Sequence, residues 1–271
     1  MRASLAVLAA ATLTATALGA NASDLPAPAE NEGETERPWV LQITPYVWGT
    51  GLSGDVSPFR RGPTIGIKKS FSDVIEDLDF AGFVNVWGRY ERFVFSADML
   101  YVSTTDSKVV HGTIPRPPLS VRLDASIDTR QFTSTLQAGY RVIETPDFTF
   151  DVLGGVRFWH ISNDVDLDVE VAGQKRRISY GEDFGWVDPV IGARAFLRMT
   201  EKLSLQAQAD VGGFGGGSNS TWSVLATANY TMTDHLSVSA GYKYLDINYE
   251  DDGHVFDTTM SGPVIGLTYR F

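Results

Sequence analysis

The sequence contains no cysteine, only four histidines and, beyond its N-terminal region, no long hydrophobic segment. Without cysteine the chain has no disulfide bonds, and it cannot carry the lipid that anchors a lipoprotein. After residue 22 no stretch approaches the ~20 apolar residues that a membrane-spanning helix needs. Basic residues are also scarce, with 22 Lys and Arg against 33 Asp and Glu, which argues against nucleic acid as a partner.

The N-terminal region has the pattern of a secretory signal peptide. An arginine precedes a run of apolar and small residues, and Ala20 and Ala22 provide a small-x-small cleavage site. We therefore predict a signal peptide over residues 1–22. Residues 23–37 are rich in Pro, Ala and Glu and predict a flexible periplasmic leader, so we expect the folded domain to span residues 38–271.

The last ten residues, GPVIGLTYRF, alternate between apolar and small or polar side chains. Because successive side chains of a strand point to opposite faces, Leu267, Tyr269 and Phe271 share one apolar face. A strand at the end of the chain leaves nothing further to cover this face, so we expect lipid to cover it. The segment resembles the terminal strand of a bacterial outer-membrane β-barrel, in which Tyr269 and Phe271 would form the assembly signal.

From residue 39 onward, segments of alternating apolar and polar residues are separated by alternately short and long connections. This pattern is typical of a transmembrane β-barrel with short periplasmic turns and long outer loops. The sequence therefore predicts an all-β protein, a closed antiparallel barrel of about ten strands with both termini in the periplasm. Hairpins within the first and third long loops would raise the count to twelve. The short connections lie near residues 90–92, 144–147, 200–202 and 233–235, and the long ones at 50–79, 104–125, 163–185, 213–219 and 250–256.

Charged residues within the predicted strands fall on the face opposite the apolar one. A charge on the lipid side costs about 2–4 kcal/mol near the centre of the bilayer, which explains this distribution without invoking a function. Because a barrel of about ten strands is narrow, we expect long Arg side chains to fill most of it as an ion-paired polar core. The alternative is a narrow, anion-preferring water path. The predicted lumen-lining residues are Arg89, Asp98, Arg141, Asp151, Arg157, Asp188, Arg194, Arg198, Asp210, Lys243 and Arg270.

Residues 70–79 predict a short helix in the first outer loop. Ser70 is a suitable N-cap, and Phe71, Val74 and Ile75 fall on one side of the helix. We expect this helix either to cover the outer mouth of the barrel or to lie on the surface of the loop.

Several motifs together resemble a family of uncharacterised outer-membrane β-barrel proteins of Gram-negative bacteria. The resemblance implies a barrel integral to the outer membrane, and it brings no assigned activity or catalytic residues. The motifs are PYVWGTGLSG (45–54), SFSDVIEDLDFAGF (70–83), GVRFW (155–159), WVDPVIGAR (186–194), DVGGFGGGSNSTW (210–222), GYKYL (241–245) and the terminal GPVIGLTYRF.

The most enzyme-like segment runs from His160 to Asn163, with the sequence His-Ile-Ser-Asn. It resembles the signature of outer-membrane phospholipase A and lipid A deacylases, in which a His general base activates a Ser to attack a lipid ester. A tight turn at residues 144–147 would place Asp128 opposite Ser162, where it could orient His160. The alternative hypothesis is therefore an outer-leaflet lipid ester hydrolase that uses Ser162, His160 and Asp128. The same register places Arg130 opposite His160, which disfavours protonation of the imidazole.

The third long loop carries four acids at every second position. On one face of a strand they could bind Ca²⁺ or bridge to lipopolysaccharide through divalent cations. The alternative is a hairpin of residues 165–171 with 175–180, in which acids face bases across the strands. The four acids are Asp164, Asp166, Asp168 and Glu170. We expect the remaining histidines, His111, His235 and His254, to be solvated.

The sequence thus favours an outer-membrane barrel with a structural or surface-interaction role, or a restricted small-solute channel, without catalysis. We expect no cofactor. The expected partners are outer-membrane lipids and lipopolysaccharide, together with the barrel-assembly machinery during biogenesis.

Overall fold

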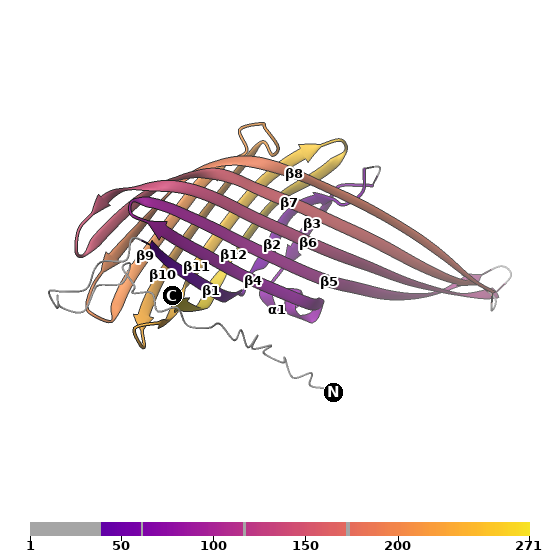
Figure 1. The fold of residues 1–271 in the computed structure, drawn as a ribbon. Coiled ribbons are helices and arrows are strands. Elements are labelled where there is room, and N and C mark those ends of the chain that lie inside the picture. The colour runs from indigo at the N-terminus through magenta and orange to yellow at the C-terminus, as the bar shows by residue number, and fades with distance from the viewer. Residues whose placement is uncertain (1–38, 61, 116–117, 172–173) are drawn as a thin grey trace.

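A computed structural model shows one antiparallel β-sheet that closes into a barrel (Figure 1). It describes residues 39–271 except 61, 116–117 and 172–173, and for residues 108–123 and 171–174 it describes the backbone alone. The predicted signal peptide 1–22 and the leader 23–37 lie outside the described residues. The elements are β1 (Trp39–Trp48), β2 (Gly51–Ser57), β3 (Ile65–Lys69), α1 (Phe71–Glu76), β4 (Leu78–Tyr90), β5 (Phe93–Pro115), β6 (Pro118–Glu144), β7 (Phe148–Val171), β8 (Gln174–Arg198), β9 (Leu203–Gly212), β10 (Ser220–Thr231), β11 (Leu236–Asp251) and β12 (His254–Arg270).

Ten strands, β1 and β4 to β12, form the closed barrel. Closure occurs where β1 pairs with the end of β12, with Gln42 opposite Arg270 and Trp48 opposite Val264. The other two strands, β2 and β3, arise from the first long loop and lie beside the earlier half of β12. The predicted closed barrel of ten strands and the hairpin hidden in the first loop are confirmed. The third loop adds no separate strands, because its residues belong to β7 and β8.

The four predicted short turns are present, but two of the predicted long loops are wrong. Residues 104–125 and 163–185 lie almost entirely within continuous strands, so that β5, β6, β7 and β8 reach 23, 27, 24 and 25 residues. The physical reason is that apolar residues recur at every second position through these segments, as at Val165, Leu167 and Val169. Figure 1 shows these four strands continuing together far beyond the rest of the barrel, and we call this part the extension.

The short helix predicted in the first outer loop is confirmed as α1. Ser70 is its N-cap, and Ser70 and Asp73 form a reciprocal capping box. None of its residues is buried, so α1 lies on the surface rather than inside the mouth. Within the described part of the chain, no helix has the length and apolar character needed to cross a membrane.

Apolar side chains cover the outer face of the barrel. Val47, Ile191 and Ile265 are 64%, 59% and 61% exposed, and each lies on the outward side of its strand. Below the extension, charged side chains such as Arg141 and Asp151 point inward and are buried. The charged groups of this part of the barrel therefore lie in its lumen.

Candidate functional site

The barrel has two unlike ends, which we call the turn end and the loop end. The turn end carries the four short turns, the start of β1 and the end of β12. The loop end carries the longer connections and the extension. The half of the lumen toward the turn end is lined mainly by polar and charged residues around a small apolar cluster of Val40, Trp87, Val94 and Leu153, and the half toward the loop end is mainly apolar.

Arg141 and Asp151 form a fully buried ion pair near the turn end. Arg141 Nε donates to Asp151 Oδ1 at 2.8 Å. Arg194 Nη1 lies 3.9 Å from Oδ2 of the same carboxylate, and its guanidinium lies 4.5 Å from the centroid of the Trp87 ring. Two cations thus share one anion, and the aromatic face of Trp87 supports the second cation.

Arg157 joins three other strands in the middle of the barrel. Its Nη2 donates to Asp210 Oδ1 at 2.7 Å, and its other nitrogens donate to Thr135 Oγ1 and Thr221 Oγ1, each at 2.9 Å. Ser223 Oγ donates to the second Asp210 oxygen at 2.6 Å. A buried pair with this many hydrogen bonds is the arrangement in which two charges tolerate burial.

Lys243 reaches across the lumen from β11 to β5. Its Nζ donates to Asp98 Oδ2 at 2.7 Å and to the Tyr46 hydroxyl at 3.1 Å, while that hydroxyl donates to the other Asp98 oxygen at 3.0 Å. The ammonium also lies 5.0 Å from the centroid of the Trp48 ring. This group marks the level at which the lumen changes from polar to aromatic.

A polar cavity of about 120 Å³ lies between these ion pairs, and we call it the lumen chamber. One water molecule needs on the order of 10–15 Å³ by the same measure, so the chamber has room for several. Thr133 Oγ1 and Gln137 Nε2 are buried in its wall and have no hydrogen-bond partner among the described residues. The lumen chamber is therefore suited to water or a small polar solute.

The other predicted lumen residues lie at the two borders of the polar half. At the turn end, Arg89 Nη1 donates to the Glu91 carbonyl at 2.6 Å, Arg198 is half-buried and Arg270 is buried. At the other border, Asp188 is fully buried and accepts hydrogen bonds from Trp186 Nε1 at 2.9 Å and from the Ser218 amide at 2.6 Å. Asp188 thereby anchors the Gly-rich connection between β9 and β10.

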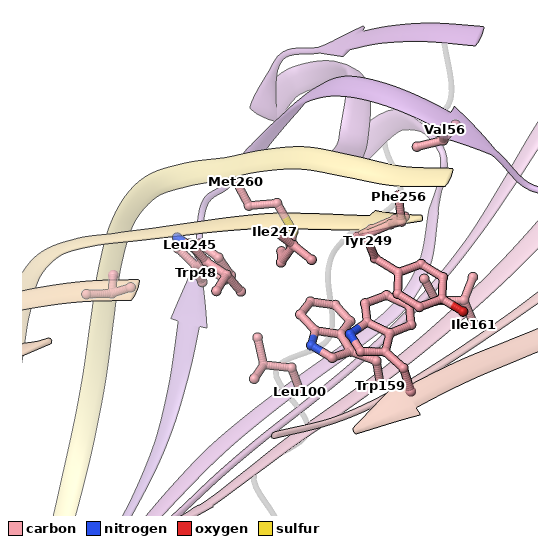
Figure 2. Packing of buried hydrophobic residues seen from close by; sticks show 12 residues of the cluster. Trp48, Val56, Leu100, Trp159, Ile161, Leu245, Ile247, Tyr249, Phe256 and Met260 are labelled. Atoms are coloured by element: carbon pink, nitrogen blue, oxygen red, sulfur yellow. The ribbon is translucent and has the colours of Figure 1, made fainter. Parts of the chain in front are cut away.

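Aromatic residues fill the loop-end half of the lumen (Figure 2). Trp186 stacks on Tyr249 with ring centroids 3.9 Å apart, and Trp159 stacks on Trp186 at 5.3 Å. Phe256 lies across both tryptophan rings at 5.8 and 6.0 Å. We define the aromatic cluster as the buried residues Trp48, Val56, Leu100, Trp159, Ile161, Trp186, Leu245, Ile247, Tyr249, Phe256, Met260 and Val264.

The aromatic cluster forms because two strands of the barrel are shorter than their neighbours. β9 ends at Gly212 and β10 begins at Ser220, whereas β8 and β11 continue toward the loop end. Beyond this level β8 meets β11 through stacked rings, with Phe184 and Trp186 against Tyr249. The loop end is therefore two packed layers rather than an open mouth.

Glu182 fastens the β2–β3 connection over the loop end. Its Oε2 accepts hydrogen bonds from the Arg60 amide at 3.1 Å and the Tyr180 hydroxyl at 2.9 Å, and its Oε1 lies 3.4 Å from His254 Nε2. Arg60 also forms an ion pair with Asp252. Desolvation raises the pKa of Glu182, but the hydrogen bonds and the neighbouring His254 and Arg60 outweigh it and hold that pKa below its usual range.

The prediction that His254 is solvated is wrong. Its ring is 3% exposed and stacks on Phe184 with centroids 4.3 Å apart. The contact joins β12 to β8, which are distant in sequence, so no local sequence pattern predicts it. His235 is exposed at a turn as expected, and the side chain of His111 lies outside the described residues.

The barrel wall is split beside β1, and we call this split the seam. β1 pairs with β4 only as far as Tyr46 opposite Phe83. Beyond that level β2, rather than β1, pairs with β12. Among the described residues β3 pairs with β2 and not with β4. Lys69 of β3 bridges the seam, because its Nζ donates to Asp77 at 2.6 Å and to Asp106 of β5 at 3.2 Å.

The predicted register of β6 and β7 is wrong by two residues. Asp128 lies opposite Asp164 rather than Ser162, and Ser162 lies opposite Arg130. A β-bulge at Val142 and a turn centred on residues 146–147, where the Thr145 amide donates to the Phe148 carbonyl, shift the pairing. Asp128 is consequently not placed across from Ser162.

The proposed hydrolase residues lie on one face but do not form a hydrogen-bonded group. His160 is exposed and pairs with Phe132 rather than Arg130, and Ser162 is half-buried two residues away. No hydrogen bond joins His160, Ser162 and Asp128 within the described part of the chain. The Asp128 carboxylate instead accepts from the Thr105 hydroxyl at 2.7 Å.

The four acids at alternate positions of β7 face basic residues, as in the predicted hairpin. Arg177 Nη2 lies 2.7 Å from Asp166 and Arg177 Nε lies 4.0 Å from Asp168, while Lys175 and Arg130 approach Glu170 and Asp164 at 3.8 and 3.7 Å. Hydrogen bonds from Arg177 and from Ser179 lower the pKa of Asp166. Among the described residues, no three His, Cys, Asp or Glu side chains are grouped as metal ligands.

Comparison with solved structures shows the class of protein to which this fold belongs. The outer membrane protease OmpT from Escherichia coli is 11% identical with a TM-score of 0.50, over 89% of this chain and 99% of that chain. The translocator domain of the autotransporter NalP from Neisseria meningitidis is 13% identical with a TM-score of 0.40, over 86% and 88%. The attachment invasion locus protein Ail of Yersinia pestis is 11% identical with a TM-score of 0.32, over 86% and 99%. The likeness to OmpT shows the fold alone, that of an outer-membrane β-barrel.

A family model described as a protein of unknown function, DUF481, matches residues 125–271, which is more than half of the chain. The chain belongs to this family, and the expected membership of an uncharacterised barrel family is confirmed. The match runs from within β6 to the end of the chain, so it includes most of the aromatic cluster. A search of curated proteins found no significant match.

Proposed function

We propose that this is an integral protein of a bacterial outer membrane that acts at the cell surface through its extension, with a lumen closed to solutes and no catalytic activity. The observation that carries the proposal is the length of β5 to β8, which stay hydrogen-bonded over 23 to 27 residues. A membrane crossing takes about 9–11 residues. The longest strand therefore continues for on the order of 50 Å beyond one crossing. A barrel that served only as an anchor would not need this surplus.

The apolar outer face supports a membrane location, since exposed side chains such as Val47 and Ile265 would be unfavourable in water. The signal-peptide pattern and the terminal Tyr269 and Phe271 support export and insertion by the barrel-assembly machinery. This orientation places the turn end and both termini in the periplasm. The extension then rises among lipopolysaccharide on the outside of the cell.

The orientation can be tested with single cysteines, because the chain has none of its own. We expect a membrane-impermeant maleimide to label Ser126→Cys in the extension on intact cells. Thr145→Cys in a turn is exposed in the structure but should be labelled only after the outer membrane is opened. The reverse labelling pattern would overturn the orientation.

The role of the extension can be tested by replacing residues 106–127 and 165–179 with short turns. The shortened barrel should still insert, because both cuts lie beyond the strand segments that cross the membrane. We expect the full protein, and not the shortened one, to bind purified lipopolysaccharide through its outer saccharides. Equal binding by both proteins, or binding by neither, would remove the support for this surface role.

The aromatic cluster supports a closed lumen, because apolar constrictions exclude water and ions. We expect the wild-type protein to show no steady conductance in planar bilayers. The double variant Trp159→Ala/Trp186→Ala should conduct, while Trp222→Ala, which removes an outward-facing tryptophan, should not. A steady conductance from the wild-type protein would instead support the restricted small-solute channel.

A further inference from the structure

We infer that the seam between β3 and β4 is a lateral entrance through which an acyl chain of a membrane lipid reaches the aromatic cluster from the bilayer. The inference rests on the membrane location proposed above. It adds a ligand class and a binding site that the closed lumen by itself does not require.

The seam lacks the ladder of backbone hydrogen bonds that joins neighbouring strands through most of the barrel wall. Where β8 passes the short strands β9 and β10 the ladder also ends, but there stacked rings of β8 and β11 close the gap. On the β1 side of β4 this ladder stops at Phe83, and the following residues toward Leu78 pair only with β5. A wall without a ladder can part without breaking backbone hydrogen bonds, whose loss in an apolar medium is costly.

The inner side of the seam is apolar and partly open. Leu52, Ile67, Tyr46 and Phe83 pack against the aromatic cluster and face the lumen, yet each is only half-buried. Two come from the β2–β3 side and two from the β1–β4 side. Most other inward-facing apolar residues at this level are buried. Accessible apolar surface is thus concentrated where the wall is interrupted.

The outer side of the seam carries exposed apolar side chains beside exposed charged ones. Val47 is exposed on β1, and Phe80 is exposed beside Tyr101, with ring centroids 5.9 Å apart. Phe71 and Ile75 of α1 are exposed at the same place. This surface continues the apolar outer face of the barrel, so the occupant that matches it is the hydrocarbon of the membrane.

Few contacts hold the seam closed. The Phe71 ring lies over Gly49, where an added Cβ would come within 3.3 Å of a ring carbon. The Lys69 ammonium pairs with Asp77 and Asp106 from the inner face, and all three side chains are a quarter to a third exposed. Partly exposed ion pairs stabilise a structure only weakly, so the bridge can open at moderate cost.

The test uses tryptophan quenching in vesicles made with brominated phosphatidylcholine, whose acyl-chain bromines quench on contact. In Lys69→Cys/Asp106→Cys, a cleavable bis-thiosulfonate reagent would join the two cysteines and lock the seam. We expect the locked protein to lose part of its quenching and to regain it when reductant cleaves the linker. Lys69→Gln, which removes the bridge without any linker, should be quenched more than wild type.

The control pair is Thr44→Cys/Thr268→Cys, which joins β1 to β12 at a point where the two hydroxyls are 2.8 Å apart and the strands are paired on both sides. Linking this pair should leave quenching unchanged. Equal quenching of the locked and unlocked seam, together with a wild-type value for Lys69→Gln, would overturn the inference while leaving the membrane location intact.

Trp222 reports separately on the membrane location, because it is exposed on the outer face. Trp222→Phe should reduce quenching whether the seam is locked or not. If Trp222→Phe changes nothing and wild type is unquenched, the membrane location fails and the lateral entrance fails with it.

Discussion

The two halves of the lumen are formed by the same strands but are filled by different kinds of side chains. Toward the turn end, Arg157 and Asp210 form a buried ion pair beside the lumen chamber. Toward the loop end, Trp159 and Trp186 stack in a cluster of apolar side chains. The bilayer constrains only the outward face of each strand, so the inner face can be polar or aromatic. Strand periodicity therefore determines which face a side chain occupies, and not the chemistry of the lumen.

The largest expected effect is a loss of stability in the polar half of the lumen. Arg157→Met leaves Asp210 buried without its cation, and removing one partner of a buried pair costs about 3–5 kcal/mol. The free energy of unfolding, measured by urea titration in lipid vesicles, should fall by this amount. Arg157→Met/Asp210→Asn should recover a large part of the loss, because no unpaired charge remains. A double variant as unstable as the single one would show that packing, rather than charge, dominates this half.

The corresponding change in the aromatic half is Trp186→Ala. Removing a buried tryptophan costs about 3 kcal/mol or more, and the value should lie at the lower end because the cluster borders the half-buried Phe184. The same urea titration measures it. Trp186→Phe should recover most of the loss, since the stack on Tyr249 depends on an aromatic ring. A loss below about 1 kcal/mol for Trp186→Ala would mean that the cluster is loosely packed.

Much of the fold was predictable from residue alternation and turn residues, including the ten barrel strands and the helix capped by Ser70. The aromatic half of the lumen was not predicted, although consecutive apolar residues such as Phe158 and Trp159 indicate it. Only a strand with apolar residues on both faces has such a pair. The register of β6 on β7 was also missed, because the bulge at Val142 has no clear signature in the sequence.

The loop end further depends on contacts between segments that are far apart in the chain. His254 is buried because Phe184, seventy residues earlier in the sequence, covers its ring. Likewise, the seam follows from β3 pairing only with β2 among the described residues. Neither arrangement is encoded by a local pattern, so sequence reasoning could not find them.

A smaller effect concerns the layer above the aromatic cluster, where acid should loosen the β2–β3 connection. The pKa of Glu182 is lowered in the folded protein. Its stabilising contribution is therefore present above the ordinary Glu pKa of about 4.3 and is lost as pH falls through the lowered value. Hydrogen exchange at the Arg60 amide, which donates to Glu182, should show protection that declines in this acidic range. Glu182→Gln should remove the pH dependence, and unchanged protection of wild type in acid would contradict this assignment.

The smallest expected effect lies on the outer surface of β7, outside both halves of the lumen. His160 is exposed, and no hydrogen bond joins it to Ser162 in the described structure. His160→Ala should therefore change the free energy of unfolding by no more than about 0.5 kcal/mol. Wild type and variant should be equally inactive when phospholipid and lipid A are assayed for released fatty acid. Ester cleavage by the wild-type protein that disappears in both His160→Ala and Ser162→Ala would instead establish the hydrolase. The functional surface would then lie on the outer face, and neither half of the lumen would explain it.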